Sequence, residues 1–291
     1  MKLRRIISWF ADIAAIGLFI YLLIFPKAAT EPTRSALEFC GITLIPSLFI
    51  YMVLSKMIIT LPITEKLIKV MGLSTFSLLT GTLCGCPVGA KNATTLYEQE
   101  RITKKHAEYL CSFTNNAGVS FVIGFVGSEL FGDKSIGIRL FIYQLTASII
   151  TAFIMKYLLF GKERLPRMNP CNSSKIGLRE AVADSAEAML NICASAVFFM
   201  VAGSVAVNLF SLGQTGEAIL RSALEFSSGC AAAAKCGIYP LPITAFAVGQ
   251  TGLCVALQVK SVLGNRLSIR PFLLGKLISC AVMVFLAVIF G

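Results

Sequence analysis

The sequence predicts an all-α, polytopic membrane protein with about seven transmembrane helices, two re-entrant hairpins and an inverted structural repeat. Hydrophobic residues make up 56% of the 291 residues and charged residues only 14%, whereas a soluble domain usually carries about 25% charged residues. Apolar runs close to the ~20 residues that cross a bilayer recur along the whole chain. Two stretches rich in small residues also recur at matched positions in the two halves.

The apolar runs set the expected order of elements. The seven expected spans are 6–25, 39–59, 109–131, 138–160, 189–212, 243–263 and 271–290. The two expected re-entrant hairpins are the stretches 74–97 and 219–238. The expected organisation is a first transmembrane helix at 1–30, a first repeat at 31–160, a cytoplasmic linker at 161–180 and a second repeat at 181–291.

The first apolar run is expected to be a retained span rather than a cleaved signal peptide. Its basic start, Met1–Arg5, is similar to that of a signal sequence. However, Ile6–Phe25 is long, and no small-residue cleavage pattern follows it. Pro26 ends the run instead.

Three ordered blocks of similar sequence indicate an ancient duplication. The aligned blocks are Leu48–Ile50 with Phe198–Met200, Gly81–Lys91 with Glu225–Lys235, and Leu130–Lys134 with Val262–Arg266. If each small-residue stretch is a hairpin, each half has three true spans, and an odd number turns the second half over in the membrane. Inverted repeats with broken helices around a midplane site are typical of secondary transporters.

The net charge of +11 favours a membrane protein over a nucleic-acid-binding one, because the positive residues lie in short loops beside apolar runs. Six of the 26 Lys and Arg fall on the expected external side: Lys27, Arg34, Lys134, Arg139, Arg221 and Lys235. The other 20 fall on the side of the N-terminus. Lys91, Lys235 and Lys276 are expected within the membrane or at its border, and leaving them out does not change the sign of the bias. This bias predicts a cytoplasmic N-terminus, a cytoplasmic linker and an external Gly291.

The first hairpin carries glycines at a spacing of four, namely Gly81, Gly85 and Gly89. Small residues at this spacing let helix backbones approach closely in lipid. Pro87 is expected to break the helix at the tip, and broken backbone at membrane depth is tolerated where it is buried or lines a wet cavity. Tight packing alone is the alternative. A cavity-lining role is favoured because two such stretches occur at matched positions.

Lys91 and Lys235 are expected within the membrane, where an ammonium usually faces a cavity or a counter-ion. The alternative is that each side chain reaches a membrane surface. Glu225 also lies in an apolar region and can pair with Lys235, which would leave that lysine no free charge for a substrate.

Polar residues interrupt two of the expected spans. Thr114, Asn115 and Asn116 lie in the third, and Gln250 and Thr251 take the corresponding place in the sixth. Unpaired carboxamides are costly in lipid, so these groups are expected to contact a substrate or to form hydrogen bonds between helices.

Other classes of function find little support, and we expect no catalytic residue, no metal site and no cofactor. The one histidine, His106, is expected in a cytoplasmic loop, away from Cys84 and Cys86. Most of the ten cysteines lie in apolar runs, where Cys acts as a small hydrophobe. No zinc-binding spacing is present.

Four motifs resemble those of a known family. They are Cys86–Lys91, Tyr97–Glu98, Leu110–Asn116 and Leu224–Gly229. Together they resemble the YlbJ-type sporulation integral membrane proteins, which belong to a wider group with nucleoside-recognition "Gate" domains. The chain is shorter than typical members, and Cys86 stands where a bulkier residue is expected, so the substrate can differ.

The resemblance implies a role in sporulation and the transport of dipicolinate, a small planar dianion, across the outer forespore membrane. It also implies that 31–160 and 181–291 are Gate-like repeats. The expected hairpin or gate residues are Gly85, Cys86, Pro87, Gly89, Glu225 and Gly229. The expected substrate-binding residues are Lys91, Thr114, Asn115, Asn116, Ser227, Ser228, Lys235, Gln250 and Thr251.

Two alternatives stay open, a non-transporting membrane scaffold for spore assembly and a transporter of nucleosides or another small metabolite. Nucleoside transport ranks lower because aromatic stacking partners are sparse near the interruptions, with Phe113 and Phe246 the best candidates. The expected partners are the lipid bilayer, a small anionic metabolite, and either a second copy of the chain or other sporulation membrane proteins.

Overall fold

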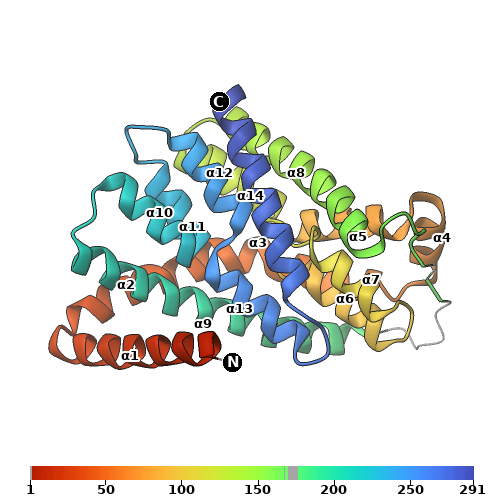
Figure 1. Ribbon diagram of the computed structural model, residues 1–291, viewed down its shortest axis with the longest axis horizontal. Helices are drawn as coiled ribbons and strands as arrows, with labels where there is room; N and C mark the ends of the chain where they lie inside the picture. Colours follow the sequence, from red (N-terminus) through yellow and green to blue (C-terminus); the bar gives the residue numbers. More distant parts are fainter. Residues whose placement is uncertain (1, 167, 170–175) are drawn as a thin grey trace.

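The computed structural model describes residues 2–166, 168–169 and 176–291, and every regular element in these ranges is a helix. In chain order the elements are α1 (Lys2–Ile24), α2 (Lys27–Phe39), the π-helical η1 (Cys40–Leu44), α3 (Ile45–Ile58), α4 (Pro62–Met71), α5 (Leu73–Cys84), α6 (Val88–Glu98), α7 (Lys104–Cys111), the π-helical η2 (Ser120–Leu130), α8 (Lys134–Phe160), α9 (Leu178–Phe210), α10 (Gln214–Leu224), α11 (Phe226–Ala233), α12 (Pro240–Gln250), α13 (Gly252–Leu263) and α14 (Arg270–Phe290). Helices from both halves cross one another in a single bundle (Figure 1).

Five helical stretches among the described residues are long and apolar enough to cross a membrane. They are Lys27–Ile58, Lys134–Phe160, Leu178–Phe210, Pro240–Leu263 and Arg270–Phe290. The first joins α2, η1 and α3 in one run, and the fourth joins α12 and α13 through a break. Each stretch is at least as long as the roughly 20 apolar residues that cross the hydrocarbon core of a bilayer. The polytopic, all-helical class is therefore confirmed.

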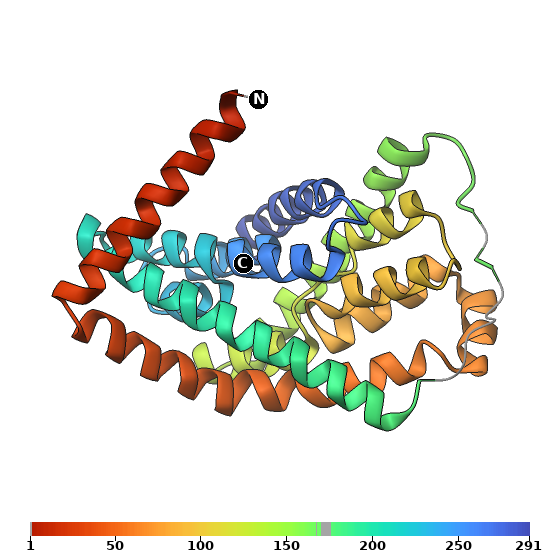
Figure 2. The same ribbon diagram turned by 90° about the horizontal axis from the view of Figure 1, so that it is seen from below.

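Two expected spans are not among these five stretches. α1 (Lys2–Ile24) follows the first expected span, 6–25, and its side chains are described without a gap only from Asp12 onward, so that span stays a prediction. Figure 2 shows α1 projecting away from the rest of the bundle. The third expected span is divided between α7 and η2, because residues 112–118 leave the helical conformation. The helices Ile63–Met71 and Leu73–Cys84 form a bent pair, at 112° to each other. If this pair is one broken span, the number of crossings among the described residues rises from five to six.

Two helices begin earlier than the apolar runs predict. The second expected span begins at Lys27 rather than at residue 39, because Lys27–Phe39 is helical although it carries charged side chains. α9 begins at Leu178, inside the expected linker 161–180, and Glu180 lies in its first turn, where negative charge stabilises a helix. Residues 167 and 170–175 of that linker lie outside the described residues.

Both halves of the chain follow one order of elements. In each, a long helical run is followed by two short helices joined at a sharp break, then by a broken helix, then by a final long helix. The first half has one helix more, α4, between its long run and the two short helices. The first long runs of the two halves pack against each other in antiparallel fashion. Cys40 Sγ donates to Cys193 O at 3.9 Å, and further along, Lys56 pairs with Asp184.

The final long helices, α8 and α14, also pack together and run in opposite directions (Figure 1). Near the start of α8, the Tyr143 hydroxyl donates to the carbonyl of Phe290, at the end of α14, over 3.1 Å. Helices with the same place in the two halves are therefore antiparallel neighbours.

The Gly-Cys blocks that align in the sequence do not occupy equivalent places in the structure. Gly85 lies in the break after α5, whereas Gly229 lies inside α11. An added Cβ at Gly229 would lie 2.4 Å from Ser222 Cα, so this glycine allows α10 and α11 to approach closely. The break in the second hairpin is at Glu225 instead. The sequence alignment therefore pairs two glycines with different roles. Gly85 allows a break in the chain, whereas Gly229 allows two helices to pack closely.

Candidate functional site

The first hairpin consists of α5 and α6, which meet at the break Gly85–Pro87. Gly85 has a φ of +82°, a value that favours glycine. Gly81 and Gly89 lie against the backbone of Thr114, where an added Cβ would be 2.0 and 2.4 Å from the carbonyl oxygen. The close approach predicted from the glycine spacing is therefore present, and it seats the hairpin on the break between α7 and η2.

That break falls where the sequence predicts an interruption. Asn115 Oδ1 accepts from Ala90 N at 2.8 Å, and Asn115 Nδ2 donates to Cys111 O at 3.0 Å. Asn116 Nδ2 donates to Thr82 Oγ1 at 3.1 Å. Both side chains are buried, and their bonds satisfy backbone freed by the break and tie it to the first hairpin.

A further carboxamide, Gln144 of α8, completes this break, although the sequence motifs do not predict it. Its Oε1 accepts from Ala117 N at 3.1 Å and its Nε2 donates to Ala117 O at 2.9 Å. Ser148, one turn later, donates to Asn116 Oδ1 at 3.0 Å, and Thr114 Oγ1 donates to the backbone one turn before it at 2.8 Å. The sequence signal that could have identified Gln144 is its position as a glutamine within an otherwise apolar span.

The second half has its break between α12 and α13, again where the sequence predicts one. Thr251 and Gly252 have φ values of +62° and +77°. Gln250 Oε1 accepts from Gly252 N at 3.2 Å, and its amide donates to Ser222 O. A carboxamide thus satisfies the freed backbone at both breaks, as burial in a membrane requires.

The second hairpin consists of α10 and α11, with Glu225 at its break. Glu225 Oε1 accepts from Ser227 N at 3.0 Å and Oε2 accepts from Ser228 N at 2.8 Å, which makes Glu225 the N-cap of α11. Lys235 lies just past the end of α11 and is exposed. The Glu225 carboxylate therefore serves the helix, and its bonds go to serines rather than to Lys235.

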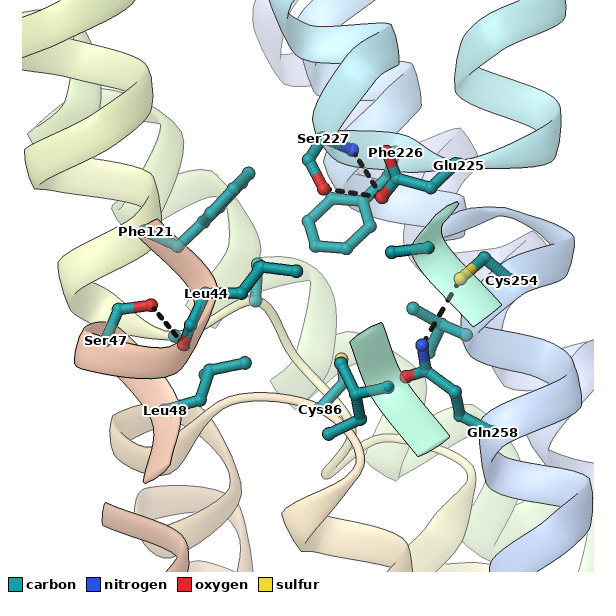
Figure 3. A pocket seen from close by; sticks show the side chains of 15 residues that line it. Leu44, Ser47, Leu48, Cys86, Phe121, Glu225, Phe226, Ser227, Cys254 and Gln258 are labelled. Carbon is teal, nitrogen blue, oxygen red and sulfur yellow. Dashed lines mark hydrogen bonds between the residues drawn. The ribbon is translucent and has the colours of Figure 1, made fainter. Parts of the chain in front are cut away.

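A small cavity lies where the two hairpin tips, the first break and α13 meet (Figure 3). Its volume is about 30 Å³, which is room for roughly one water molecule. Cys86 from the first tip, Gly118 from the first break, Glu225 and Ser227 from the second tip, and Cys254 of α13 contribute to its walls. We call this space the central cavity. In this conformation it is too small for a metabolite.

A second space, which we call the Lys91 cavity, adjoins it. Its volume is about 340 Å³, within the range of small-molecule sites. Its polar lining residues are Lys91, Asp184, Glu187, Asn191, Ser195, Gln258 and Ser261. Ile192 and Gln258 line both cavities, so these two side chains separate the larger space from the smaller one.

The Lys91 ammonium remains available to a ligand. Lys91 Nζ donates to the backbone carbonyl of Asp184 at 3.1 Å, while the Asp184 carboxylate pairs with Lys56 of α3. No carboxylate in the described part of the chain forms an ion pair with Lys91, although Glu187 lies in the same cavity wall. From the sequence, Lys56 is one of the charges expected on the cytoplasmic side, because no local pattern reveals a partner 128 positions later, at Asp184.

His106 is not in a loop, as the sequence predicts, but in the first turn of α7. It is buried, and its ring lies 6.2 Å from that of Tyr109 and 6.3 Å from that of Phe160. Neither ring nitrogen has a hydrogen-bond partner among the described residues. Within the same residues no group of three or more His, Cys, Asp or Glu side chains is placed to hold a metal ion.

Comparison with known proteins supports the family seen in the motifs. The chain is 30% identical over 126 residues to the sporulation integral membrane protein YlbJ of Bacillus subtilis (strain 168). The resemblance to the YlbJ-type sporulation integral membrane proteins is confirmed. The match covers 40% of this chain and 31% of the Bacillus protein, so the chain matches less than a third of the length of YlbJ. No family model matches the chain, and no solved structure matches it significantly.

The description of YlbJ and the apolar helices of this chain both indicate a location in a membrane. YlbJ is described as an integral membrane protein, and this chain has five apolar stretches of spanning length among its described residues. The chain is therefore an integral membrane protein.

Proposed function

We propose that this chain is a transporter of a small carboxylate, with dipicolinate in a sporulating bacterium as the first candidate. One observation carries the proposal: the half-buried Lys91, with no carboxylate paired to it in the described chain, lines a cavity of about 340 Å³ beside the first hairpin tip. An intramembrane ammonium of this kind usually marks a substrate or ion path. The similarity to YlbJ supports the link to sporulation.

The proposed architecture is an inverted repeat with about seven spans and two re-entrant hairpins. The common order of elements and the antiparallel packing of α8 with α14 support it. So does the meeting of both hairpin tips at the central cavity. In this arrangement the N-terminus and the linker 161–180 are cytoplasmic, Gly291 is external, and the membrane is the outer forespore membrane.

In the proposed cycle, a carboxylate first binds Lys91. The N-terminal end of α6, which carries Lys91, adds the positive end of a helix dipole. Ile192 and Gln258 then move apart, and the central cavity widens as the two hairpins separate. The carboxamides Asn115 and Gln250 hold the broken backbone during this movement, because freed backbone groups must stay paired in the membrane.

Uptake by reconstituted vesicles tests the proposal. Proteoliposomes containing the purified chain are expected to accumulate labelled dipicolinate faster than protein-free liposomes, and unlabelled dipicolinate should compete while uridine should not. Competition by uridine instead would favour nucleoside transport. No uptake of either compound by correctly inserted protein would favour the scaffold role.

The orientation has a separate test. Reporter fusions after Lys162 and after Gly291 are expected to lie on opposite sides of the membrane. Reporters on the same side would mean that one hairpin is a full span, and the inverted repeat would then be wrong.

A further inference from the structure

A second buried cation, Lys276, lies on α14. It shares the buried face of this helix with Phe272, Gly275, Ser279 and Met283, spaced three and four positions apart. Only 7% of Lys276 is exposed, so its side chain does not reach out to a membrane surface. Among the described residues nothing forms a hydrogen bond or an ion pair with its ammonium.

Lys276 lies close to elements of the proposed transport site. Next to it, Gly275 packs on the break after α7, where an added Cβ would lie 1.9 Å from the carbonyl oxygen of Ser112. Cys86, at the first hairpin tip, packs on the same break, where its thiol donates to the carbonyl of Asn116 over 3.0 Å. Cys86 also lines the central cavity. Lys276 is thus placed behind the wall that the first hairpin tip gives to that cavity.

The charges of the central cavity need such a cation. Glu225 provides a carboxylate in its walls, and no lysine or arginine of the described chain lines it. A carboxylate leaving Lys91 would therefore meet a negative group with no positive group in reach. The ionisable groups of the described residues near Lys276 are two thiols, that of Cys86 and that of Cys280, which lies one turn further along α14. A displacement of the tip that carries Cys86 would open Lys276 to the cavity.

We propose that Lys276 is a second anion-binding residue of the transport path, which binds the carboxylate of the transported molecule after it has passed Ile192 and Gln258. This inference rests on the proposed function and adds to it. Lys91 binds the anion first, in the larger cavity, and Lys276 binds it next, beside the first hairpin tip. With two successive cations, a small carboxylate can move from one binding residue to the next and does not stay bound at either.

The test compares variants in proteoliposomes supplied with labelled dipicolinate. Lys276→Met keeps the length of the side chain and removes its charge, Lys276→Arg keeps the charge, and Lys134→Met removes an exposed lysine at the start of α8 as a control. Uptake rates are divided by the amount of folded protein, taken from thermal unfolding in detergent.

We expect Lys276→Met to lower the maximal uptake rate about tenfold or more, the loss of one hydrogen bond to a charged group. Equilibrium binding of dipicolinate at Lys91 should be retained. Lys276→Arg should keep a larger share of the rate than Lys276→Met, and Lys134→Met should match the wild type. If Lys276→Met does not fold, Lys276→Gln, which keeps a polar end but no charge, takes its place: a lowered uptake rate per folded molecule supports the proposal, and a wild-type rate overturns it.

Wild-type uptake with Lys276→Met would also overturn the role of Lys276 and leave the proposed function standing. Absence of uptake by the wild type itself would overturn the proposed function.

Discussion

The two hairpins follow one plan and present different chemistry at their tips. In the first, α5 and α6 meet at Gly85–Pro87, and Lys91 lies in the first turn of α6, beside a cavity. In the second, α10 and α11 meet at Glu225, whose carboxylate caps α11, while Lys235 lies past the far end of that helix and is exposed. One tip offers a cation, and the other offers a carboxylate that is already bonded.

Under the proposed function, this difference gives the two halves different tasks. Glu225 accepts from two backbone amides and from the Ser227 hydroxyl at 2.5 Å, so it fixes the shape of the second tip. Lys91 is bonded to a single carbonyl and keeps donors for a ligand. We therefore expect the first hairpin to bind the anion and the second to serve as the structural partner against which it moves.

The largest expected effect is that of Lys91→Ala on transport. Removal of the ammonium deletes a charged hydrogen bond to the substrate, so uptake of dipicolinate should fall by about tenfold to a hundredfold. Lys91→Arg keeps the charge and should retain part of the activity. The measurement is the initial rate of uptake per folded protein, and a rate equal to the wild type would remove Lys91 from the site.

Next in size is the effect of Gly89→Ala on folding. The added Cβ would lie 2.4 Å from Thr114 O, and such overpacking destabilises a protein by about 1–3 kcal/mol. Gly124→Ala is the control, because a Cβ there meets nothing within 4 Å. Thermal unfolding in detergent measures both. Equal melting temperatures for the two variants would show that the first hairpin does not depend on close contact with the break.

Loss of the cap at the second tip should have a smaller effect. Glu225→Ala leaves the amides of Ser227 and Ser228 without their partner, which should cost about 1 kcal/mol of stability. Uptake per folded molecule should fall less than it does with Lys91→Ala. If uptake falls as far as with Lys91→Ala while the melting temperature is unchanged, the carboxylate takes part in transport directly.

The smallest expected effect is that of Lys235→Ala. The sequence predicts a substrate-binding residue here, matched to Lys91, but the side chain is exposed past the end of α11. A surface substitution of this kind should change uptake by no more than about twofold. A loss as large as that of Lys91→Ala would show that the second hairpin also presents a cation, and that the two tips share the task.

The helices and their interruptions were predictable because membrane burial leaves a strong local signal. Apolar runs of spanning length predict α8, α9 and α14, and carboxamides within such runs predict the breaks at Asn115 and Gln250. The spacing of Gly81 and Gly89 likewise predicts a close approach of backbones, because only the absence of a side chain allows it.

The partners of the charged groups could not be predicted in the same way. The pairing of Lys56 with Asp184 joins residues far apart in the chain, and the burial of Lys276 depends on the packing of α14 against other helices. The equivalence of Lys91 and Lys235 rested on a local match of glycines, which the break at Glu225 displaces. Local sequence therefore located the hairpins but not the charges that surround them.

Equilibrium binding of labelled dipicolinate to the purified protein tests most directly whether the Lys91 cavity is the binding site. The wild type is expected to bind saturably, Lys91→Ala should weaken binding about tenfold or more, and Lys235→Ala should leave the Kd within about twofold of the wild type. Equal affinity in the wild type and in Lys91→Ala would contradict the assignment of the anion site to the first hairpin.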